Sequence, residues 1–192
     1  AEELEEFRRY LELIAHESSR CGQIVSNLLS FSRQQEMERR PIEINDIIRS
    51  VILLCQHRMQ LQNIVIDEKL DPDLPEISGD YNQIQQCIMN VIFNAMEAMP
   101  DGGKLTVSTS FKRKNRMLHI NITDTGCGIP EENLSIIFEP FFSTKEVSQG
   151  VGLGLSVVYG IIREHQGNIY VKSEVGKGST FTIRFPEGQK DF

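Results

Sequence analysis

The sequence predicts a two-layer α/β sandwich, in which helices cover one face of a mixed, largely antiparallel sheet, preceded by a long amphipathic helix. Two observations lead to this fold class. After Pro41, strand patterns alternate with helical patterns, and tight turns join two pairs of neighbouring strands as antiparallel hairpins. Before Pro41, apolar residues recur at alternating steps of three and four, which is typical of one long helix.

Composition and charge narrow the class of protein. Of the 192 residues, 40% are apolar and 24% are charged, which is ordinary for a soluble globular chain. No apolar run approaches the roughly 20 residues of a membrane-spanning helix, and the acidic start AEELEEF is not a signal peptide. The formal charge of −7 argues against a nucleic-acid partner. We therefore expect a cytoplasmic segment without membrane contact, with any membrane anchor of a full-length protein lying upstream.

The four cysteines are far apart and lack the close spacing of metal sites or small disulfide frameworks. We expect all four to be ordinary buried or half-buried thiols: Cys21, Cys55, Cys87 and Cys127.

Two domains are predicted, residues 1–40 and residues 41–192. The first carries a heptad seam, apolar at all positions but one: Leu4, Phe7, Leu11, Ile14, Ser18, Cys21, Val25 and Leu28. A lone helix cannot bury such a stripe, so a partner helix is implied. Pro41 ends this helix.

The second domain is predicted to contain three helices and six strands. Asn45 is expected to cap the first of these helices, and a glycine-rich stretch occupies 124–154. The predicted helices are 45–61, 81–99 and 155–165, and the predicted strands are 42–44, 64–70, 105–111, 117–123, 169–173 and 180–185.

Two asparagines lie on one stripe of the helix predicted over 81–99. Asn90 and Asn94 are four residues apart, so their side chains project from the same face, and Glu97 follows one turn later. Asparagine is unfavourable inside helices because its side chain competes for backbone hydrogen bonds. A pair of amides at a solvated helix end would give this pattern, and so would amide oxygens that bind a hard cation such as Mg²⁺.

Two glycine-rich segments have the composition of ligand-binding loops. DTGCGIP, from Asp124 to Pro130, directly follows a predicted strand, and its carboxylate can accept a hydrogen bond from an exocyclic amine. GVGLGL, which begins at Gly150, precedes a helix, where backbone N–H groups can hold phosphates. Its spacing matches neither the dinucleotide fingerprint nor the P-loop. Either segment alone also fits an ordinary turn.

Together these motifs resemble the ATP-binding domain of the histidine kinase family, of the GHKL or Bergerat type that is shared with Hsp90, MutL and DNA gyrase. The resemblance covers residues of about 41 to 187. The matching segments, in chain order, are NVIFNAMEAM (the N box), DTGCGIP (the first glycine box), IFEPFFSTK (the F box), GVGLGLS (the second glycine box) and the closing hairpin GKGSTFTIRFP. The chain is identified as a member of this family on five segments in the family's order.

The resemblance implies ATP and Mg²⁺ as cofactors and a role for each matching residue. Asn94 is expected to be the principal Mg²⁺ ligand, with Asn90 assisting. Asp124 is expected to accept from the adenine amine, and Thr180 to support the adenine end. The remaining ATP-binding residues are expected to be Gly126, Gly128, Lys145, Gly150, Gly152, Leu153 and Gly154.

Three phenylalanines, Phe138, Phe141 and Phe142, lie in the segment that resembles the mobile lid over the nucleotide. Lys145, in the same lid, is placed to reach the phosphates. The rings could dock on a neighbouring domain, or they could pack beneath the loop.

Position 90 separates the branches of the family. ATPase relatives typically carry a glutamate there that activates water, whereas the amide of Asn90 cannot act as a general base. The resemblance therefore implies phosphate transfer from Mg-ATP to a histidine of a dimerisation hairpin, in two-component signalling with a response regulator receiver domain. The alternatives are a non-catalytic ATP-sensing module and a GHKL-type ATPase or anti-sigma-like serine kinase.

His16 does not fit the phosphoacceptor of such a kinase. No proline follows it in the expected place, and the distance from His16 to Pro41 is too short for the rest of one helix and a second long helix. Residues 1–40 instead resemble the second helix of the hairpin, which in the full-length protein forms a homodimer. We expect the acceptor histidine to lie outside this chain.

Overall fold

The computed structural model describes residues 7, 10, 38–143 and 152–188. The chain divides into two units, Ala1–Glu36 and Met37–Phe192. Phe7 and Tyr10 are helical, and most of the long helix predicted before Pro41 lies outside the described residues. The predicted end of that helix is placed too late, because residues 38 and 39 are not helical and residue 40 already belongs to a strand.

The second unit contains a five-stranded sheet in the order β2-β4-β5-β7-β6 and a small antiparallel pair of β1 and β3. Within the larger sheet only β2 and β4 are parallel. The helices are α2 (Ile44–Leu61), α3 (Tyr81–Glu97) and α4 (Gly154–Glu164), with a 3₁₀ turn over Glu131–Asn133. The strands are β1 (Arg40–Ile42), β2 (Ile64–Lys69), β3 (Ile77–Gly79), β4 (Gly103–Lys112), β5 (Met117–Asp124), β6 (Asn168–Glu174) and β7 (Gly178–Pro186).

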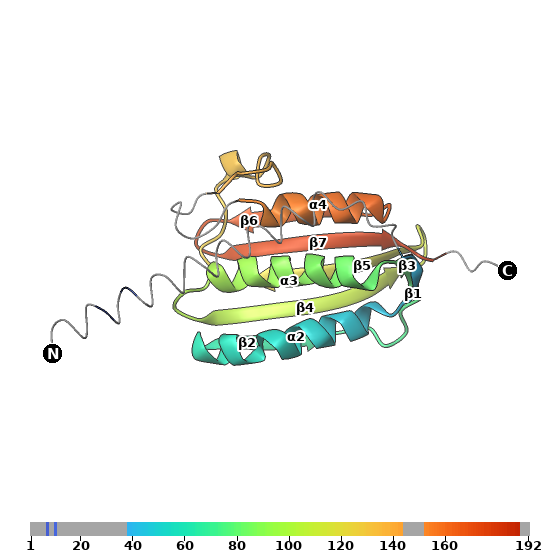
Figure 1. Ribbon diagram of the computed structural model, residues 1–192, viewed down its shortest axis with the longest axis horizontal. Helices are drawn as coiled ribbons and strands as arrows, with labels where there is room; N and C mark the ends of the chain where they lie inside the picture. Colours follow the sequence, from blue (N-terminus) through green and yellow to red (C-terminus); the bar gives the residue numbers. More distant parts are fainter. Residues whose placement is uncertain (1–6, 8–9, 11–37, 144–151, 189–192) are drawn as a thin grey trace. The chain divides into compact units, whose positions relative to one another are not determined.

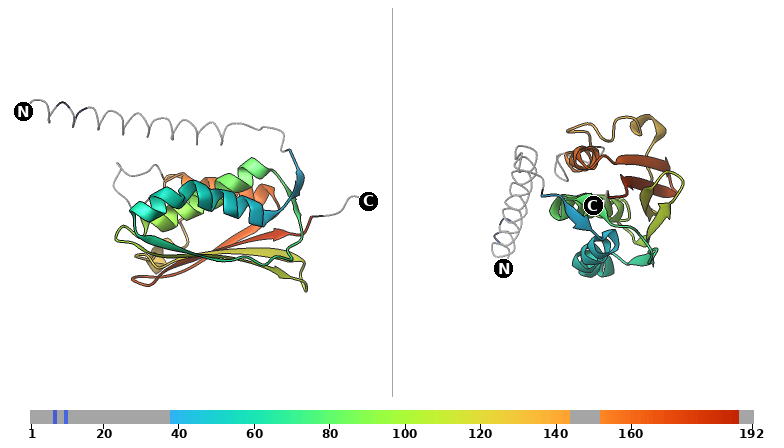
Figure 2. Two further views of the ribbon diagram at one scale, coloured as in Figure 1. Left: turned by 90° about the horizontal axis from the view of Figure 1, so that it is seen from below. Right: turned by 90° about the vertical axis from the view of Figure 1, so that its right-hand side faces the viewer.

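Helices α2, α3 and α4 lie on one face of the sheet (Figures 1 and 2). The predicted two-layer sandwich with a mixed, largely antiparallel sheet is therefore confirmed. Its physical basis is visible in β5, where every second side chain is buried. The buried residues of α3 recur at helical spacing and face these strand residues.

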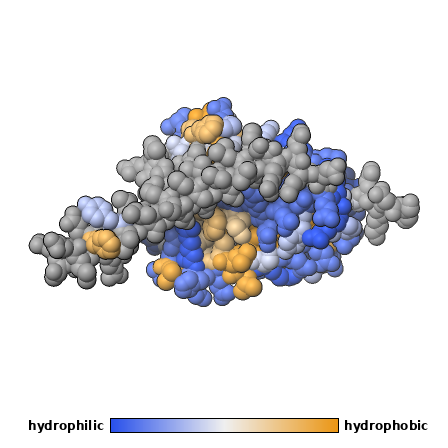
Figure 3. Space-filling model, in the orientation of Figure 1, coloured by the Kyte–Doolittle hydropathy of each residue, from blue (hydrophilic) through white to orange (hydrophobic). Residues whose placement is uncertain are grey.

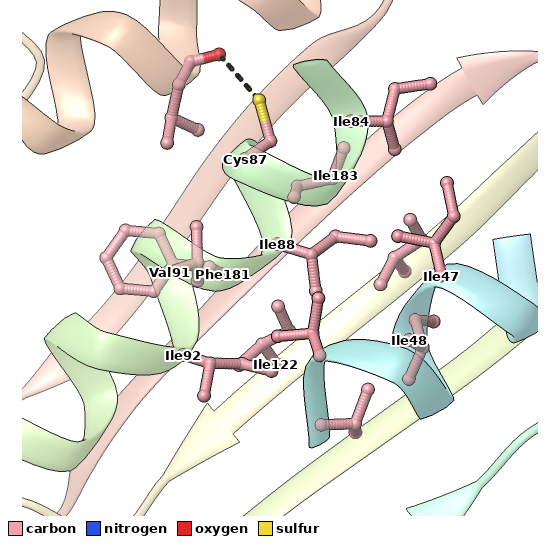
Figure 4. Packing of buried hydrophobic residues seen from close by; sticks show 14 of the residues in the cluster. Ile47, Ile48, Ile84, Cys87, Ile88, Val91, Ile92, Ile122, Phe181 and Ile183 are labelled. Carbon is pink, nitrogen blue, oxygen red and sulfur yellow. Dashed lines mark hydrogen bonds between the residues drawn. The ribbon is translucent and has the colours of Figure 1, made fainter. Parts of the chain in front are cut away.

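The core between the two layers consists mainly of isoleucine. Ile88 and Ile92 of α3 meet Ile122 of β5 and Ile183 of β7, and all four side chains are almost completely buried (Figure 4). The thiol of Cys87 packs in the same cluster, 3.7 Å from the carbonyl oxygen of Val158 in α4. Burial raises the pKa of this thiol, so it stays neutral inside the core.

The start of α2 differs from its prediction. The helix begins one residue earlier, with Glu43 at the N-cap position and no side-chain cap. Asn45 does not cap it, because its amide nitrogen donates to the carbonyl oxygen of Asp71 (2.8 Å) and its amide oxygen accepts from the hydroxyl of Thr109 (3.1 Å). The short strand β3 was not predicted. It forms because Ile77 pairs with Ile42 of β1 and both side chains are buried.

The outer side of α2 carries exposed apolar side chains. Leu53, Leu54 and Leu61 are 70%, 65% and 71% exposed, and Figure 3 shows hydrophobic residues gathered over α2 and α3 on this side of the molecule. The core-facing stripe of α2 is therefore not its only apolar surface.

His165, directly after α4, ties that helix to the start of α3. The ring is buried; its Nδ1 lies 2.8 Å from the carbonyl oxygen of Ile161, and its Nε2 accepts from the backbone N–H of Asp80 (2.9 Å). The N–H of Asp80 can only donate, so the hydrogen of the neutral ring is on Nδ1. Asp80 in turn caps α3, because its carboxylate accepts from the N–H groups of Asn82 and Gln83.

Burial is the main cause that lowers the pKa of His165, and the charge of Arg39 adds to it, against the opposing effects of the hydrogen bond with Ile161 and of the charges of Asp80 and Glu164. Because the folded pKa lies below the ordinary histidine value, the stability that the neutral ring contributes is present above that ordinary value. It is lost as the pH falls through the folded pKa.

Replacing His165 with alanine should destabilise the fold measurably. The substitution leaves the Asp80 N–H without its acceptor, which costs about 1–3 kcal/mol of unfolding free energy, and the cavity left by the ring adds to the loss. The matched control is His57→Ala on the exposed side of α2, expected to change stability by less than about 0.5 kcal/mol. Urea unfolding at neutral pH measures both, and equal effects would contradict the role given to His165.

Candidate functional site

Asn90 of α3 lies beside the start of α4, and Asn94 follows it one turn later on the same helix face. Asn90 and Asn94 are both half-buried. The amide nitrogen of Asn90 donates to the carbonyl oxygen of Gly154 at 3.5 Å, a long hydrogen bond that leaves the amide oxygen turned the other way. The side chain of Asn94 has no hydrogen-bond partner among the described residues. Two amide oxygens on one helix face are thus available near the N-terminus of α4.

Asp124, the last residue of β5, is a buried carboxylate with one oxygen held and one oxygen free. It is 3% exposed. Its Oδ1 accepts from the N–H groups of Gly126 (2.9 Å) and Ser179 (3.2 Å), while Oδ2 accepts no hydrogen bond from the part of the chain that the structure describes. Burial raises the pKa of Asp124, and the hydrogen bonds from these N–H groups oppose that rise.

The first glycine box lies between the end of α3 and the hairpin of β6 and β7. The N–H of Cys127 donates to the carbonyl oxygen of Ala98 (3.0 Å), and the carbonyl oxygen of Cys127 accepts from the N–H of Gly176 (2.8 Å). Gly128 has a φ of 73°, and a Cβ on it would lie 2.2 Å from the carbonyl oxygen of Glu174. Only glycine therefore allows the loop to pass this close to the hairpin.

The second glycine box is joined to the F box through backbone contacts. The N–H of Phe141 donates to the carbonyl oxygen of Gly152 (3.0 Å). Gly152 has a φ of 70°, and a Cβ there would lie 2.5 Å from the carbonyl oxygen of Phe142. Leu153 is buried and Gly154 opens α4 without a side-chain cap. No side chain of the described residues caps this first turn, so its N–H groups can bind an anion.

The three phenylalanines of the F box have different environments. Phe138 and Phe142 are half-buried and pack against the core, and the ring of Phe138 lies 5.7 Å from that of Tyr159. Phe141 is 69% exposed. Packing beneath the loop therefore accounts for Phe138 and Phe142, whereas Phe141 presents its ring to the surroundings.

The structure does not bring the hydroxyl of Thr180 to the buried side of this site. Thr180 pairs with Thr123 across β7 and β5, and their hydroxyl oxygens are 3.0 Å apart on the open face of the sheet. A hollow of about 290 Å³ at this end of the sheet is lined by Thr123, Thr180 and Lys172, and also by Asp124, Ser173 and Ser179. Ser179, the neighbour of Thr180 in sequence, has its N–H on Asp124 and is buried. The role predicted for Thr180 therefore stays a prediction, while alternation along β7, with Phe181 in the core, places the hydroxyl of Ser179 rather than that of Thr180 on the face of Asp124.

Some predicted site residues lie outside the described residues, namely Lys145, Gly150 and the questioned histidine His16. Within the described ranges, no cluster of three or more His, Cys, Asp or Glu side chains could hold a metal ion. No helix within those ranges is long and apolar enough to cross a membrane.

The cysteine prediction needs one correction among the three cysteines that the structure describes; Cys21 lies outside the described residues. Cys55 and Cys87 are buried, but Cys127 in the first glycine box is exposed, because its backbone rather than its side chain makes the contacts of the loop.

Comparison with known proteins assigns this arrangement to a family. The family described as "Histidine kinase-, DNA gyrase B-, and HSP90-like ATPase" matches residues 79–189. Sporulation kinase C of Bacillus subtilis (strain 168) is 38% identical over 178 residues, which cover 92% of this chain and 41% of that protein. The chain spans less than half the length of the curated relatives it matches.

Solved structures agree with this assignment. The nucleotide-free catalytic domain of histidine kinase ThkA has a TM-score of 0.71 and 31% identity, over 79% of this chain and 97% of that chain. Histidine kinase ThkA in complex with response regulator protein TrrA has a TM-score of 0.79 and 28% identity, over 94% of this chain and 51% of that chain.

The chain therefore belongs to the histidine kinase-, DNA gyrase B- and HSP90-like ATPase family. Within that family it carries the ATP-binding catalytic domain of a sensor histidine kinase, as the order of its sequence motifs predicted.

Replacing Asp124 with asparagine should stabilise the fold at neutral pH. Because the folded pKa of Asp124 is raised, the folded state loses stability as the pH rises from the ordinary aspartate value through the folded pKa. The amide oxygen of asparagine can still accept from Gly126 and Ser179, and it carries no charge to bury. Thermal unfolding of both proteins across this pH range should show an advantage of the variant that grows with pH. An advantage that is constant or shrinks would contradict this expectation.

Proposed function

We propose that this chain binds Mg-ATP beside Asp124, the asparagines of α3 and the N-terminus of α4, and transfers the γ-phosphate to a histidine on a partner helical hairpin. The observation that carries the binding part is the carboxylate of Asp124, which is buried, fixed by two backbone N–H groups through one oxygen, and open at the other. Such an oxygen suits the exocyclic amine of adenine.

The phosphate end of the proposed site is the junction of α3 and α4. The uncapped first turn of α4 supplies backbone N–H groups and the positive end of the helix dipole. The oxygens of Asn94 and Asn90 are hard donors of the kind that Mg²⁺ prefers, and two amides alone leave room for phosphate oxygens and water. Bound Mg²⁺ would neutralise charge on the β- and γ-phosphates. The residues of this chain hold the nucleotide and direct its γ-phosphate outward.

Transfer to a protein is favoured over hydrolysis because the site offers no base at position 90. Asn90 is an amide, and its nitrogen is directed to the carbonyl oxygen of Gly154. An amide cannot take a proton from water at neutral pH. The group that orients or deprotonates the acceptor is therefore expected on the partner hairpin.

The partners follow from the same assignment. Residues 1–40 are proposed to be the second helix of the dimerisation hairpin, and the full-length protein is proposed to be a homodimer with its catalytic domain in the cytoplasm. Because ThkA is a histidine kinase that forms a complex with a response regulator, we propose a receiver domain as the protein that takes the phosphate in the next step.

The central test uses Mg-ATP labelled on the γ-phosphate, this chain, and the separately produced hairpin of the full-length protein with its acceptor histidine. We expect acid-labile label on the hairpin histidine and none on the chain when it is incubated alone. Label on His16 would contradict the assignment of residues 1–40. Multiple-turnover hydrolysis without label would favour an ATPase, and ATP binding without either reaction would favour a non-catalytic ATP-sensing module.

Removing the proposed Mg²⁺ ligand should weaken both binding and transfer. Asn94→Ala deletes one oxygen donor, and the loss of a charge-assisted contact lowers affinity for Mg-ATP roughly tenfold to a hundredfold. Asn82→Ala is the matched control, because Asn82 is an exposed asparagine and the second residue of the same helix. Calorimetric titration with Mg-ATP measures the difference. If Asn94→Ala retains the affinity of Asn82→Ala, the assigned ligand is wrong.

The neighbouring hydroxyls of β7 give a second pair of matched variants. Ser179→Ala removes a hydroxyl on the face of Asp124 and should weaken ATP binding about fivefold. Thr180→Ala removes a hydroxyl on the open face and should leave the affinity within about twofold. Displacement of a fluorescent ATP analogue compares them in one assay, and a larger loss in Thr180→Ala would reverse our assignment of the two residues.

A further inference from the structure

Ser173 of β6 connects the first glycine box, Gly178 and Ser179 through its hydroxyl. It pairs directly with Ser179 across β6 and β7, and Asp124 lies next in the same row because Thr123 pairs with Thr180. The row from Asp124 through Ser179 to Ser173 is therefore on the helix-covered face of the sheet.

The hydroxyl of Ser173 uses its whole hydrogen-bonding capacity. Its oxygen accepts from the N–H of Ile129 (2.7 Å), at the end of the first glycine box, and lies 2.9 Å from the hydroxyl oxygen of Ser179. It donates to the carbonyl oxygen of Gly178 (3.0 Å). A serine hydroxyl has one hydrogen and two lone pairs.

These contacts fix the direction of the bond between the two serines. A carbonyl oxygen can only accept, so the one hydrogen of Ser173 goes to Gly178. The hydrogen between the two hydroxyls must then come from Ser179. With its hydrogen committed to Ser173, the hydroxyl of Ser179 offers only lone pairs to a ligand. The free oxygen of Asp124 likewise only accepts while the carboxylate is ionised.

We propose that Ser173 is a positioning residue for base recognition, because it makes Ser179 an acceptor and so gives the base end of the site two acceptors and no hydroxyl donor. This inference rests on the proposed binding of ATP at Asp124 and deepens it. Two acceptors, acting directly or through a bound water, match a purine with a 6-amino group, which donates. They mismatch a purine with a 6-oxo group, which accepts.

The distinguishing probe is ITP, which carries an oxygen in place of the 6-amino group of ATP. In the full chain, Ser173→Ala frees the hydroxyl hydrogen of Ser179 to turn toward the ligand. ITP should then bind more tightly, because a hydroxyl donor can face its 6-oxo group, whereas ATP loses an oriented acceptor. The ratio of ATP to ITP affinity should therefore fall about fivefold to tenfold. Ser173→Thr keeps the hydroxyl and should hold the ratio within about twofold of the wild type.

Two further measurements separate positioning from a general structural effect. Thr182→Ala deletes another hydroxyl of β7, one that donates to Asn121 on the open face, and it should leave the ratio unchanged. Amide hydrogen exchange at Ile129 should be faster in Ser173→Ala and unchanged in Ser173→Thr, because the acceptor of that N–H is lost only in the first variant.

The outcomes are distinguishable. Equal weakening of ATP and ITP in Ser173→Ala, a ratio that does not change, or a fall of the same size in Thr182→Ala would overturn the role of Ser173 while leaving ATP binding in place. A wild-type chain that binds neither nucleotide would overturn both this inference and the proposed function. A fall in the ratio that Ser173→Thr restores, together with faster exchange at Ile129 in Ser173→Ala alone, supports the proposal.

Discussion

Side chains of β5 and β7 alternate between a face covered by three helices and an open face, and the positions of the functional groups follow from this alternation. Ile120 and Ile122 fill the core, and the next residue in that series is Asp124, which thereby enters the same buried layer at its end. On β7, Ser179 precedes the core residue Phe181 by one step of the same series. The hydrophobic contacts that hold the helices on the sheet therefore also hold Asp124 and Ser179, the proposed recognition groups, in place.

The loops of the site depend on this scaffold for their shape. The first glycine box contacts the end of α3 through Ala98 and the closing hairpin through Gly176 and Ser173, so two elements far apart in the chain define one loop. The second glycine box is held from the other side by the F box at Phe141. Both loops are thus fixed by backbone contacts that a side chain would obstruct, which is why glycine occurs where these contacts are closest.

Asp124, a proposed recognition group at the edge of the core, lowers the stability of the fold when it is ionised. Its burial raises the pKa of the carboxyl group and opposes ionisation. Two backbone N–H groups reduce that cost, and a bound ligand amine would reduce it further. Without a ligand, an asparagine at this position would give a more stable fold. Toward a ligand amine, however, its amide would present an N–H donor where the carboxylate presents a free acceptor oxygen. Stability and recognition therefore impose different requirements on this position.

The sequence by itself determined the family and the layer architecture, because the strands, helices and glycine boxes carry local signals of period and backbone shape. It also pointed to Asn90 and Asp124, whose side chains contact the second and the first glycine box in the structure. Only the tertiary structure placed Ser179 rather than Thr180 on the face of Asp124, moved Asn45 from a helix cap to a contact with Asp71, and brought Ser173 into the row beside Asp124. Those choices depend on which face of a strand is covered and which loops meet there, and no local pattern contains that information.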